Sequence, residues 1–423
     1  MATKSIYDLP TTGLHFFGAD EYEQKKEVKS FNIVLWSNSD EVNFLTDELF
    51  SCIYADNLIR YKNQIEQYKS TLKCILCNCI ESVMTTRTQI LVPLNHNEYT
   101  NIASRYNPIG ITSRVFINLI EWLAKNDFID LYKAIKGANS ELRTVIIVTD
   151  KLRELIHSYE IKYTQVMNHE GLEPIELKRA KKLIDYDDNS STTKDRKILK
   201  NYQELLNSHK TKIKIDGKLC NERVIIKRIY TEEFNKHGRF YGGSWQNCKS
   251  FLRKTITIND KETVEIDIVN CSLRMALQLS KINMTNDLYT IKDYPRELVK
   301  DTINMMFNIS NVKSDKQGID RTAKALKSKY EDMDLTYLKE IAQDCFSHYS
   351  SIADKWFFQG RGLDLQYLDS CICIRVIEEF TNINEIVLTV HDSYIVRKEL
   401  EDKLKESIIR NYEEIIGDRP IIR

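Results

Sequence analysis

The sequence predicts an α+β protein in which a small antiparallel sheet carries two aspartates and most of the remaining chain is helical. Two short runs rich in β-branched residues flank His391-Asp392-Ser393, a pattern typical of a tight hairpin. A further run, residues 264–268, alternates apolar and acidic side chains and leads into a helical pattern that begins at Ser272. With 13 glycines and 6 prolines in 423 residues, long flexible linkers are not expected.

We expect three regions: a helix-rich N-terminal accessory region (1–160), a connector with a helix (161–222) and a core (223–423). Within the first region, residues 58–84 have the periodicity of an amphipathic helix. This helix carries a cysteine cluster made of Cys74, Cys77 and Cys79. A zinc site would need a second ligand pair that the sequence does not supply, so the cluster is interpreted as helical core and surface thiols.

A segment at about 98–150 is similar in pattern to a winged helix, a shape often used against duplex DNA. Residues 111–128 have helical periodicity, and two strands should follow, separated by a turn at Gly137-Ala138-Asn139-Ser140. A helix packed on an ordinary hairpin would give the same pattern. Farther on, polar residues that begin at 185 indicate a connector, and a long helix is expected at 194–209.

Composition limits the location and the partners. The longest apolar runs are shorter than the roughly 18 residues that a membrane span needs, and the N-terminus lacks the apolar stretch of a signal peptide. We therefore expect a cytoplasmic protein with no membrane contact and with reduced cysteines. The net charge is zero, yet a basic stretch predicts a phosphate-contacting surface. This stretch comprises Arg223, Lys227, Arg228, Lys236, Arg239, Lys249, Arg253 and Lys254.

Residues 238–247, just before the first aspartate strand, combine glycines with aromatic side chains. Glycine allows a backbone to approach a phosphate closely, an arginine can pair with that phosphate, and an aromatic ring can stack on a base or sugar. The alternative is a glycine-rich turn with aromatic packing. The candidate nucleic-acid contacts here are Gly238, Arg239, Tyr241, Trp245 and Gln246.

The two strand aspartates, Asp267 and Asp392, predict a site for divalent cations. Magnesium takes oxygen ligands and binds through one or two carboxylates together with substrate phosphates. Two such ions can clamp the attacking and leaving oxygens of a displacement at phosphorus. The alternative is that Asp392 caps a turn and that Asp267 is a charge on an edge strand.

These residues resemble motifs of the family A DNA polymerases and the single-subunit RNA polymerases. Asp267, followed seven positions later by Arg274, is similar to motif A. His391-Asp392-Ser393 resembles motif C in the form that phage and mitochondrial RNA polymerases have. Gly238-Arg239-Phe240-Tyr241 is similar to the element with which those RNA polymerases hold the template. The longer run through Gln246 most resembles uncharacterised polymerase-like proteins of bacteria and mobile elements.

In these families a fingers helix carries an arginine and, four residues later, a lysine, as Arg296 and Lys300 do here. The alternative is an exposed basic pair. Asn308 stands where the family has a tyrosine that helps to choose the sugar, so ribose or deoxyribose is left open. The resemblance and the helical spacing imply a nucleotide site made of Arg274, Arg296, Lys300, Asn304, Phe307 and Asn308.

A helix from 363 to about 380 is expected directly before the motif C hairpin. In the family a helix at this place faces the primer-template. Gln366 and Asp369 are its possible contacts, although both could instead cap and orient the helix. His391 in the hairpin is a further candidate contact to nucleic acid.

The resemblance implies a compact right-hand polymerase, with an antiparallel palm, helical fingers at about 275–380 and the N-terminal accessory region. Asp267, Asp392 and the carbonyl of Ile268 would bind two Mg²⁺ ions, for which Mn²⁺ can substitute. Lys300 and Arg296 would neutralise the triphosphate, and Lys300 could donate a proton to the leaving pyrophosphate. The enzyme would add NTPs or dNTPs to a DNA or RNA primer-template without proofreading, in a mobile element, a phage or a defence system.

Two alternatives remain open from the sequence. One is a DNA-binding replication or regulatory protein in which the palm is degenerate and the winged-helix-like segment acts. The other is a metal-dependent nuclease, for which Glu265 on the same strand face as Asp267 could add a ligand.

Overall fold

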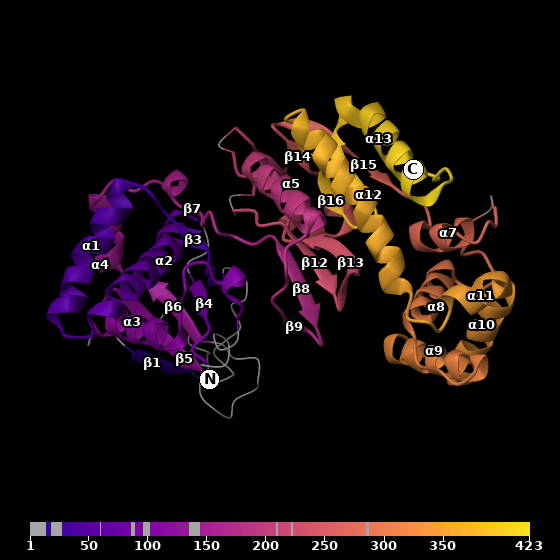
Figure 1. Cartoon of the computed structure of the whole chain (residues 1–423), viewed down its shortest axis with the longest axis horizontal. Coiled ribbons are helices and arrows are strands. Elements are labelled where there is room, and N and C mark those ends of the chain that lie inside the picture. The colour runs from indigo at the N-terminus through magenta and orange to yellow at the C-terminus, as the bar shows by residue number, and fades with distance from the viewer. Residues whose placement is uncertain are drawn as a thin grey trace, which may run out of the picture. The chain divides into compact units, whose positions relative to one another are not determined.

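The structure is a computed structural model that describes residues 14–17, 28–59, 61–85, 89–95, 102–134, 144–208, 210–220, 223–284 and 287–423. The chain forms two compact units (Figure 1). The first comprises Met1–Glu173 with Asn221–Arg223, and the second comprises Pro174–Cys220 with Val224–Arg423. Both units mix helices and strands, as predicted. No helix in the described part of the chain is long and apolar enough to cross a bilayer.

The first unit contains a five-stranded sheet with the order β1-β5-β6-β4-β2. Its strands are β1 (Leu14–Phe17), β2 (Val28–Ser30), β4 (Gln89–Val92), β5 (Ile129–Ala134) and β6 (Thr144–Val148). A separate pair consists of β3 (Leu35–Trp36) and β7 (Met167–Asn168). The α-helices are α1 (Asp40–Ala55), α2 (Ile65–Met84), α3 (Ser113–Lys125) and α4 (Asp150–Ser158). The cysteine cluster is buried on α2, and burial raises the pKa of Cys77 to about 12.

The expected wing differs from the prediction. Helix α3 is followed by the antiparallel strands β5 and β6, as the pattern indicated. However, β5 also pairs with β1, and β6 also pairs with β4, so both strands lie inside the sheet. A wing needs a two-stranded ribbon that is free to meet DNA, and this ribbon is not free. The predicted turn at 137–140 lies outside the described residues.

The second unit contains two sheets, with the orders β11-β10-β14-β15-β17-β16 and β13-β12-β8-β9. The strands of the first sheet are β10 (Ile213–Ile215), β11 (Lys218–Leu219), β14 (Thr257–Ile258), β15 (Lys261–Asp267), β16 (Leu388–Val390) and β17 (Ser393–Arg397). Those of the second are β8 (Ile175–Arg179), β9 (Lys182–Leu183), β12 (Lys227–Thr231) and β13 (Glu233–Tyr241). The predicted hairpin is confirmed, since β16 and β17 are antiparallel with Val390 opposite Ser393.

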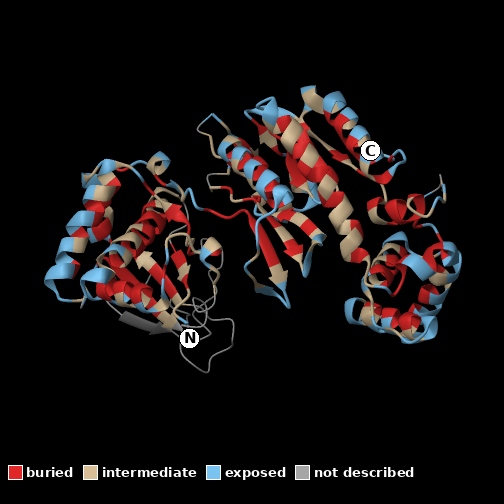
Figure 2. Ribbon diagram, in the orientation of Figure 1, coloured by how far each residue is buried: buried red, intermediate tan, exposed pale blue. Residues whose placement is uncertain are grey.

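Helices cover these sheets and build a separate helical group in the second unit. They are α5 (Ser190–Leu206), α6 (Ser250–Arg253), α7 (Cys271–Gln278), α8 (Arg296–Asn308), α9 (Asp315–Lys329), α10 (Leu335–His348), α11 (Ser350–Trp356), α12 (Gly362–Asn382) and α13 (Glu401–Ile416). In Figure 1, α8 to α11 gather together, and α12 runs from them to the sheets. Helix α12 packs against β13, α5 and α13. The buried residues form one continuous core along the strands and the inner helix faces (Figure 2).

One buried charge network joins three elements of this core. The guanidinium of Arg228 on β12 is 2% exposed and donates to Asp195 on α5 at 2.6 Å and to Ser370 on α12 at 2.9 Å. The Tyr230 hydroxyl donates to the same carboxylate at 3.0 Å. Because buried charges are stable only when they are paired, this network fixes how α5 and α12 lie on the sheet.

Candidate active site

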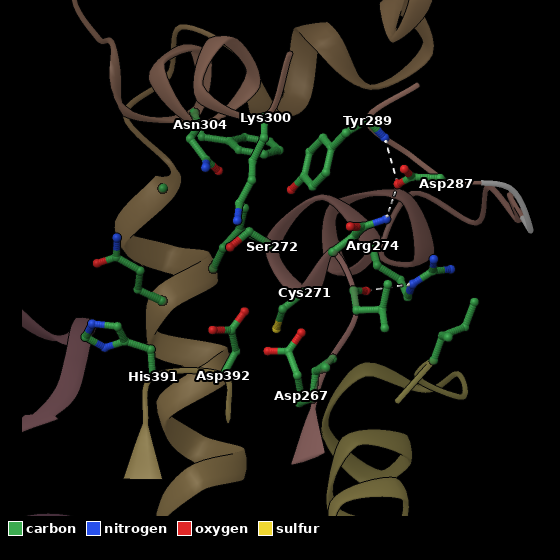
Figure 3. Close-up of a pocket in the computed structure, with 18 of the residues that line it drawn as sticks. Asp267, Cys271, Ser272, Arg274, Asp287, Tyr289, Lys300, Asn304, His391 and Asp392 are labelled. Atoms are coloured by element: carbon green, nitrogen blue, oxygen red, sulfur yellow. Dashed lines mark hydrogen bonds between the residues drawn. The ribbon is translucent and has the colours of Figure 1, made fainter. Parts of the chain in front are cut away.

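Asp267 and Asp392 lie together at one wall of a cleft of about 840 Å³. Asp267 ends β15, and its partner across the sheet is Ser393, the residue after Asp392. The amide of Ile268 donates to the backbone carbonyl of Asp392 at 3.1 Å. Figure 3 shows the two carboxylates directed toward the same space, beside the Cys271 thiol. The sheet register therefore brings together two aspartates that are far apart in the sequence.

The two carboxylates form a concentration of negative charge. Burial, followed by the charge of Asp392, raises the pKa of Asp267 to about 6. Among the described residues, no side chain forms a hydrogen bond or salt bridge with either carboxylate. Paired oxygen ligands with uncompensated charge fit a divalent cation. The described residues contain no group of three or more His, Cys, Asp or Glu that could hold a metal.

Glu265, the possible extra ligand of a nuclease site, is engaged elsewhere. Its carboxylate accepts from the Arg253 guanidinium at 3.0 Å and from the Ser393 hydroxyl at 2.6 Å. An ion pair with an arginine compensates the negative charge that a metal would require. The structure therefore supplies no third carboxylate to Asp267 and Asp392 from this strand.

The predicted helix face borders the cleft. Arg296, Lys300, Asn304, Phe307 and Asn308 on α8 all line it. Figure 3 shows Lys300 and Asn304 pointing from α8 into the space above the aspartates. Phe307 is only 1% exposed, so its ring mainly packs within the core. The Asn308 amide donates to the Asn304 carbonyl at 2.7 Å.

Arg296 differs from the prediction of a free cation for the triphosphate. Its guanidinium donates to Asp287 at 2.7 Å and to the Asn270 side chain at 3.0 Å. The hydrogen bond from Arg296 holds the pKa of Asp287 down to about 2. The charge of Arg296 is thus already compensated by the chain.

Arg274 also has a structural role that the sequence did not indicate. This residue is 5% exposed, and its guanidinium donates to the carbonyls of Val269 and Met284, both at 3.2 Å. These bonds hold the two chain segments on either side of α7. Arg274 lines the cleft, but it does not offer the free charge expected of a nucleotide ligand.

Arg239 lines the cleft from β13, and its orientation is set by Asp369 on α12. The Arg239 Nε donates to Asp369 at 3.1 Å. Asp369 is 2% exposed, and burial raises its pKa to about 6 although Arg239 opposes that shift. Asp369 is therefore an internal partner of Arg239, whereas Gln366 on the same helix faces the cleft.

Tyr241 and His391 form an aromatic pair next to the cleft. Their ring centroids are 5.9 Å apart, and the Tyr241 hydroxyl is 2.9 Å from His237 Nε2. His391 lines the cleft from the hairpin bend (Figure 3). Burial, with Arg239 nearby, lowers the pKa of His391. A neutral imidazole adds no charge beside Asp392 at neutral pH.

Trp245, Gln246 and Gly238 were predicted to contact nucleic acid, and the structure corrects this. Trp245 is fully buried, with its indole Nε1 donating to the Thr389 carbonyl at 3.1 Å, so it has no face on which a base can stack. The Gln246 amide accepts from the backbone N–H of Gly242 and donates to that same Thr389 carbonyl. A side chain at Gly238 would crowd Ser370. The alternative of a glycine-rich turn with aromatic packing describes these three residues.

Replacing Gly242 by alanine should destabilise the second unit strongly. Gly242 has φ +123°, and a Cβ atom there would overlap the Ile225 carbonyl oxygen. We expect the free energy of unfolding to fall by about 2 kcal/mol or more. The matched control is Gly217→Ala, because Gly217 has φ +70° with open space around it. The free energy of unfolding of this control should fall by only about 1 kcal/mol. Urea unfolding measures both, and equal losses would contradict the steric explanation.

Most cations of the basic stretch are bonded within the chain, whereas the prediction was a free phosphate-contacting surface; Lys249 and Lys254 are exposed. Arg223 is bonded to the Val166 carbonyl within the first unit. Five further cations of the stretch are paired with carboxylates of the second unit: Lys227 with Glu176, Arg228 with Asp195, Lys236 with Asp364, Arg239 with Asp369 and Arg253 with Glu265. Sequence counts cannot reveal this, because the acidic partners of most of these cations lie far away along the chain.

Tyr289, Asp287 and Arg423 are among the cleft residues that the sequence reasoning did not identify. Tyr289 is 3% exposed overall, but its hydroxyl points into the cleft (Figure 3). Its ring also lies 5.2 Å below the Arg296 guanidinium. No periodic pattern marks these residues, since they lie in irregular segments outside the helices and strands.

Comparison with known proteins gives limited information. No protein-family profile and no curated protein matches the sequence. Among solved structures, the chain is similar to the POL domain of Pol1 from M. smegmatis in complex with DNA primer-template and dNTP. The identity is 10% and the TM-score is 0.33, and the similarity covers 92% of this chain and 66% of that chain. This chain therefore spans just under two thirds of that domain. At these values the function must be inferred from the site itself.

Proposed function

We propose that the second unit is a nucleotidyltransferase that extends the 3′ end of a nucleic acid with nucleoside triphosphates on a template. One observation carries this proposal: two carboxylates, one at the end of β15 and one at the bend of the adjoining hairpin, face a lysine across a cation-lined cleft. Phosphoryl transfer depends mainly on positioning and on charge stabilisation, and this arrangement can supply both. No proofreading activity is proposed for the chain.

Asp267, Asp392 and the carbonyl of Ile268 would hold two Mg²⁺ ions, for which Mn²⁺ can substitute. When bound, such ions activate a 3′-hydroxyl and stabilise the charge that develops on the phosphate and the leaving group. The raised pKa of Asp267 supports this assignment, as does the absence, among the described residues, of a side-chain hydrogen bond or ion pair to either carboxylate. The sheet keeps both side chains in place before any ligand binds. The backbone of Asp267 pairs with Arg423 on one side of β15, and the next residue, Ile268, donates to the carbonyl of Asp392 on the other side.

Lys300 would bind the triphosphate and stabilise or protonate the leaving pyrophosphate. Within the described part of the chain it forms no ion pair, and its side chain points toward the aspartates (Figure 3). Asn304 and Asn308 lie farther along the same helix face, where base and sugar contacts would be made. Arg239, Tyr241, Gln366 and His391 would contact the primer-template.

A nuclease using the same aspartates has less support. Such enzymes usually bring further acidic or His ligands to the metal, and Glu265 is occupied by Arg253 and Ser393. Nor does the first unit provide a free wing for DNA binding within its described residues. Neither alternative is therefore preferred.

The proposal is tested by incubating the full chain with Mg²⁺, labelled rNTPs or dNTPs, and primed, unprimed or no template. We expect template-dependent incorporation that disappears in Asp392→Asn. The successful nucleotide and template would also identify the sugar and the priming mode. Shortening of the labelled primer without added nucleotides would instead favour the nuclease, and no reaction with any substrate would refute the proposed activity.

Lys300 and Arg296 should contribute unequally to the reaction. Lys300→Ala removes a free charge, so we expect kcat/KM for the nucleotide to fall about 100-fold. Arg296→Ala removes a charge that Asp287 already compensates, so a fall of less than about 10-fold is expected. Steady-state incorporation assays on both variants measure the difference. A larger loss in Arg296→Ala would mean that the ion pair with Asp287 breaks when nucleotide binds.

A further inference from the structure

The cleft is lined by five Lys and Arg side chains: Arg239, Arg274, Arg296, Lys300 and Arg423. Arg239 and Arg296 are paired with carboxylates, and Arg274 donates to backbone carbonyls. Among the residues that the structure describes, the side chains of Lys300 and Arg423 form no hydrogen bond or ion pair. These two are the cations whose charge remains available to a ligand.

Arg423 is held in the cleft by backbone pairing with the strand that carries Asp267. The amide of Asp267 donates to the Arg423 carbonyl at 2.9 Å, and the amide of Arg423 donates back to the Asp267 carbonyl at 3.0 Å. Ile268 and Ile422 form an antiparallel bridge, and the amide of Val269 donates to the Ile421 carbonyl at 2.8 Å. Residues 421–423 thus extend the sheet edge at the metal-binding end of β15.

This pairing determines where the Arg423 side chain can go. Side chains alternate between the two faces of an extended segment, so Ile421 and Arg423 share a face and Ile422 takes the other. In agreement, Ile421 and Arg423 line the cleft and Ile422 does not. The segment is anchored further back, where the Gln278 amide on α7 donates to the Arg419 carbonyl at 2.9 Å. The guanidinium is therefore presented by a fixed backbone.

We propose that Arg423 is a phosphate-binding residue of the active site, which acts with Lys300 on the triphosphate of the incoming nucleotide. The inference rests on the proposed function and names the residues that take the substrate's phosphates. An arginine suits this role, since its planar guanidinium can donate two parallel hydrogen bonds to a phosphate.

The alternative source of phosphate is the backbone of the nucleic acid, and the placement of the residues favours the nucleotide. Arg423 is paired through its backbone with Asp267, and Lys300 lies on α8, the helix of the candidate base and sugar contacts. Arg239 lies on β13, where it is bonded to Asp369 on α12, and His391 lies at the bend between β16 and β17. The two free cations therefore belong to other elements than the candidate nucleic-acid contacts Arg239 and His391.

Inorganic tripolyphosphate is the direct probe, because it carries the phosphates without base or sugar. Calorimetric titration of the full chain, without metal and without nucleic acid, should show binding that Arg423→Gln weakens about 10-fold or more. Arg423→Lys should retain part of the affinity. The matched control is Arg419→Gln, which removes the same charge from an exposed side chain that does not line the cleft. It should bind like the wild type.

A second measurement separates the two phosphate sources. In incorporation assays, Arg423→Gln should raise KM for the nucleotide and leave the affinity for primer-template unchanged. A loss of primer-template affinity with unchanged tripolyphosphate binding would overturn the proposal, as would equal effects of Arg423→Gln and Arg419→Gln, or no binding by the wild type. The titration needs no catalysis, so absence of incorporation by the wild type would refute the polymerase and leave the phosphate site testable.

Discussion

Asp392→Asn should reduce nucleotide incorporation by about 10³-fold or more while leaving the fold intact. Asparagine keeps the shape of the side chain but removes the negative charge that a divalent cation requires. The backbone contacts of Asp392 use its carbonyl and not its side chain, so the hairpin should survive the substitution. Incorporation assays and circular dichroism on the same preparation measure both consequences.

Asp402→Asn is the matched control, since Asp402 is an exposed residue in the first turn of α13 and does not line the cleft. It should incorporate nucleotide at the wild-type rate. If Asp392→Asn retains more than about a tenth of the activity, Asp392 does not hold a catalytic metal ion.

Asp267→Asn should also abolish incorporation, but it should stabilise the metal-free protein. The folded state raises the pKa of Asp267 from 3.8 to about 6, so it holds the proton more tightly than the unfolded chain does. The free energy of unfolding therefore falls as pH rises from about 3.8 to about 6. At pH 7 the carboxylate is ionised, and the folded state is destabilised by the whole of this effect. Because solvent screens part of this effect, removing the charge should raise the free energy of unfolding by about 1 kcal/mol, which corresponds to roughly 2–4 °C in Tm. A lower Tm in Asp267→Asn would contradict this.

The largest loss of stability is expected from Asp195→Ala. This substitution leaves the guanidinium of Arg228, which is 2% exposed, without its carboxylate partner. Removal of one member of a buried ion pair costs about 3–5 kcal/mol, because the remaining charge is buried and uncompensated. The transition of the second unit should shift down by roughly 10 °C. Thermal unfolding followed by circular dichroism measures the shift.

The neighbouring surface pair provides the comparison. Lys194 is 63% exposed and lies 3.0 Å from Glu378, and exposed pairs contribute about 0–1 kcal/mol. Lys194→Ala should therefore change Tm by only a degree or two, by the same scale. If the two substitutions have similar effects, the Arg228 network does not fix α5 and α12 as the structure suggests.

Local pattern predicted the elements that carry the site. Alternation and β-branched residues predicted the strands around Asp267 and the hairpin that holds Asp392, and both form. Helical spacing predicted that Lys300 and Asn304 share a face, and both line the cleft. These properties depend on neighbours within a few residues, because the period of a helix or strand determines which side chains share a face.

The pairing of charges and the burial of aromatic rings could not be predicted in this way. Arg239 meets Asp369, which is 130 positions away, and the indole of Trp245 meets Thr389, which is 144 positions away. The sequence shows that a side chain is basic or aromatic, but a distant partner decides whether it is free to bind a ligand.

By itself, therefore, the sequence determined the mixed helix and sheet class, the main elements of the second unit and the pair of aspartates with a lysine on a helix. Tertiary structure alone decided that Arg239 and Arg296 are paired with carboxylates, that Trp245 is a core residue and that Arg423 is placed beside Asp267. The physical reason is the range of the interactions. Periodicity reports local burial, whereas hydrogen bonds, ion pairs and sheet edges join segments that the sequence keeps apart.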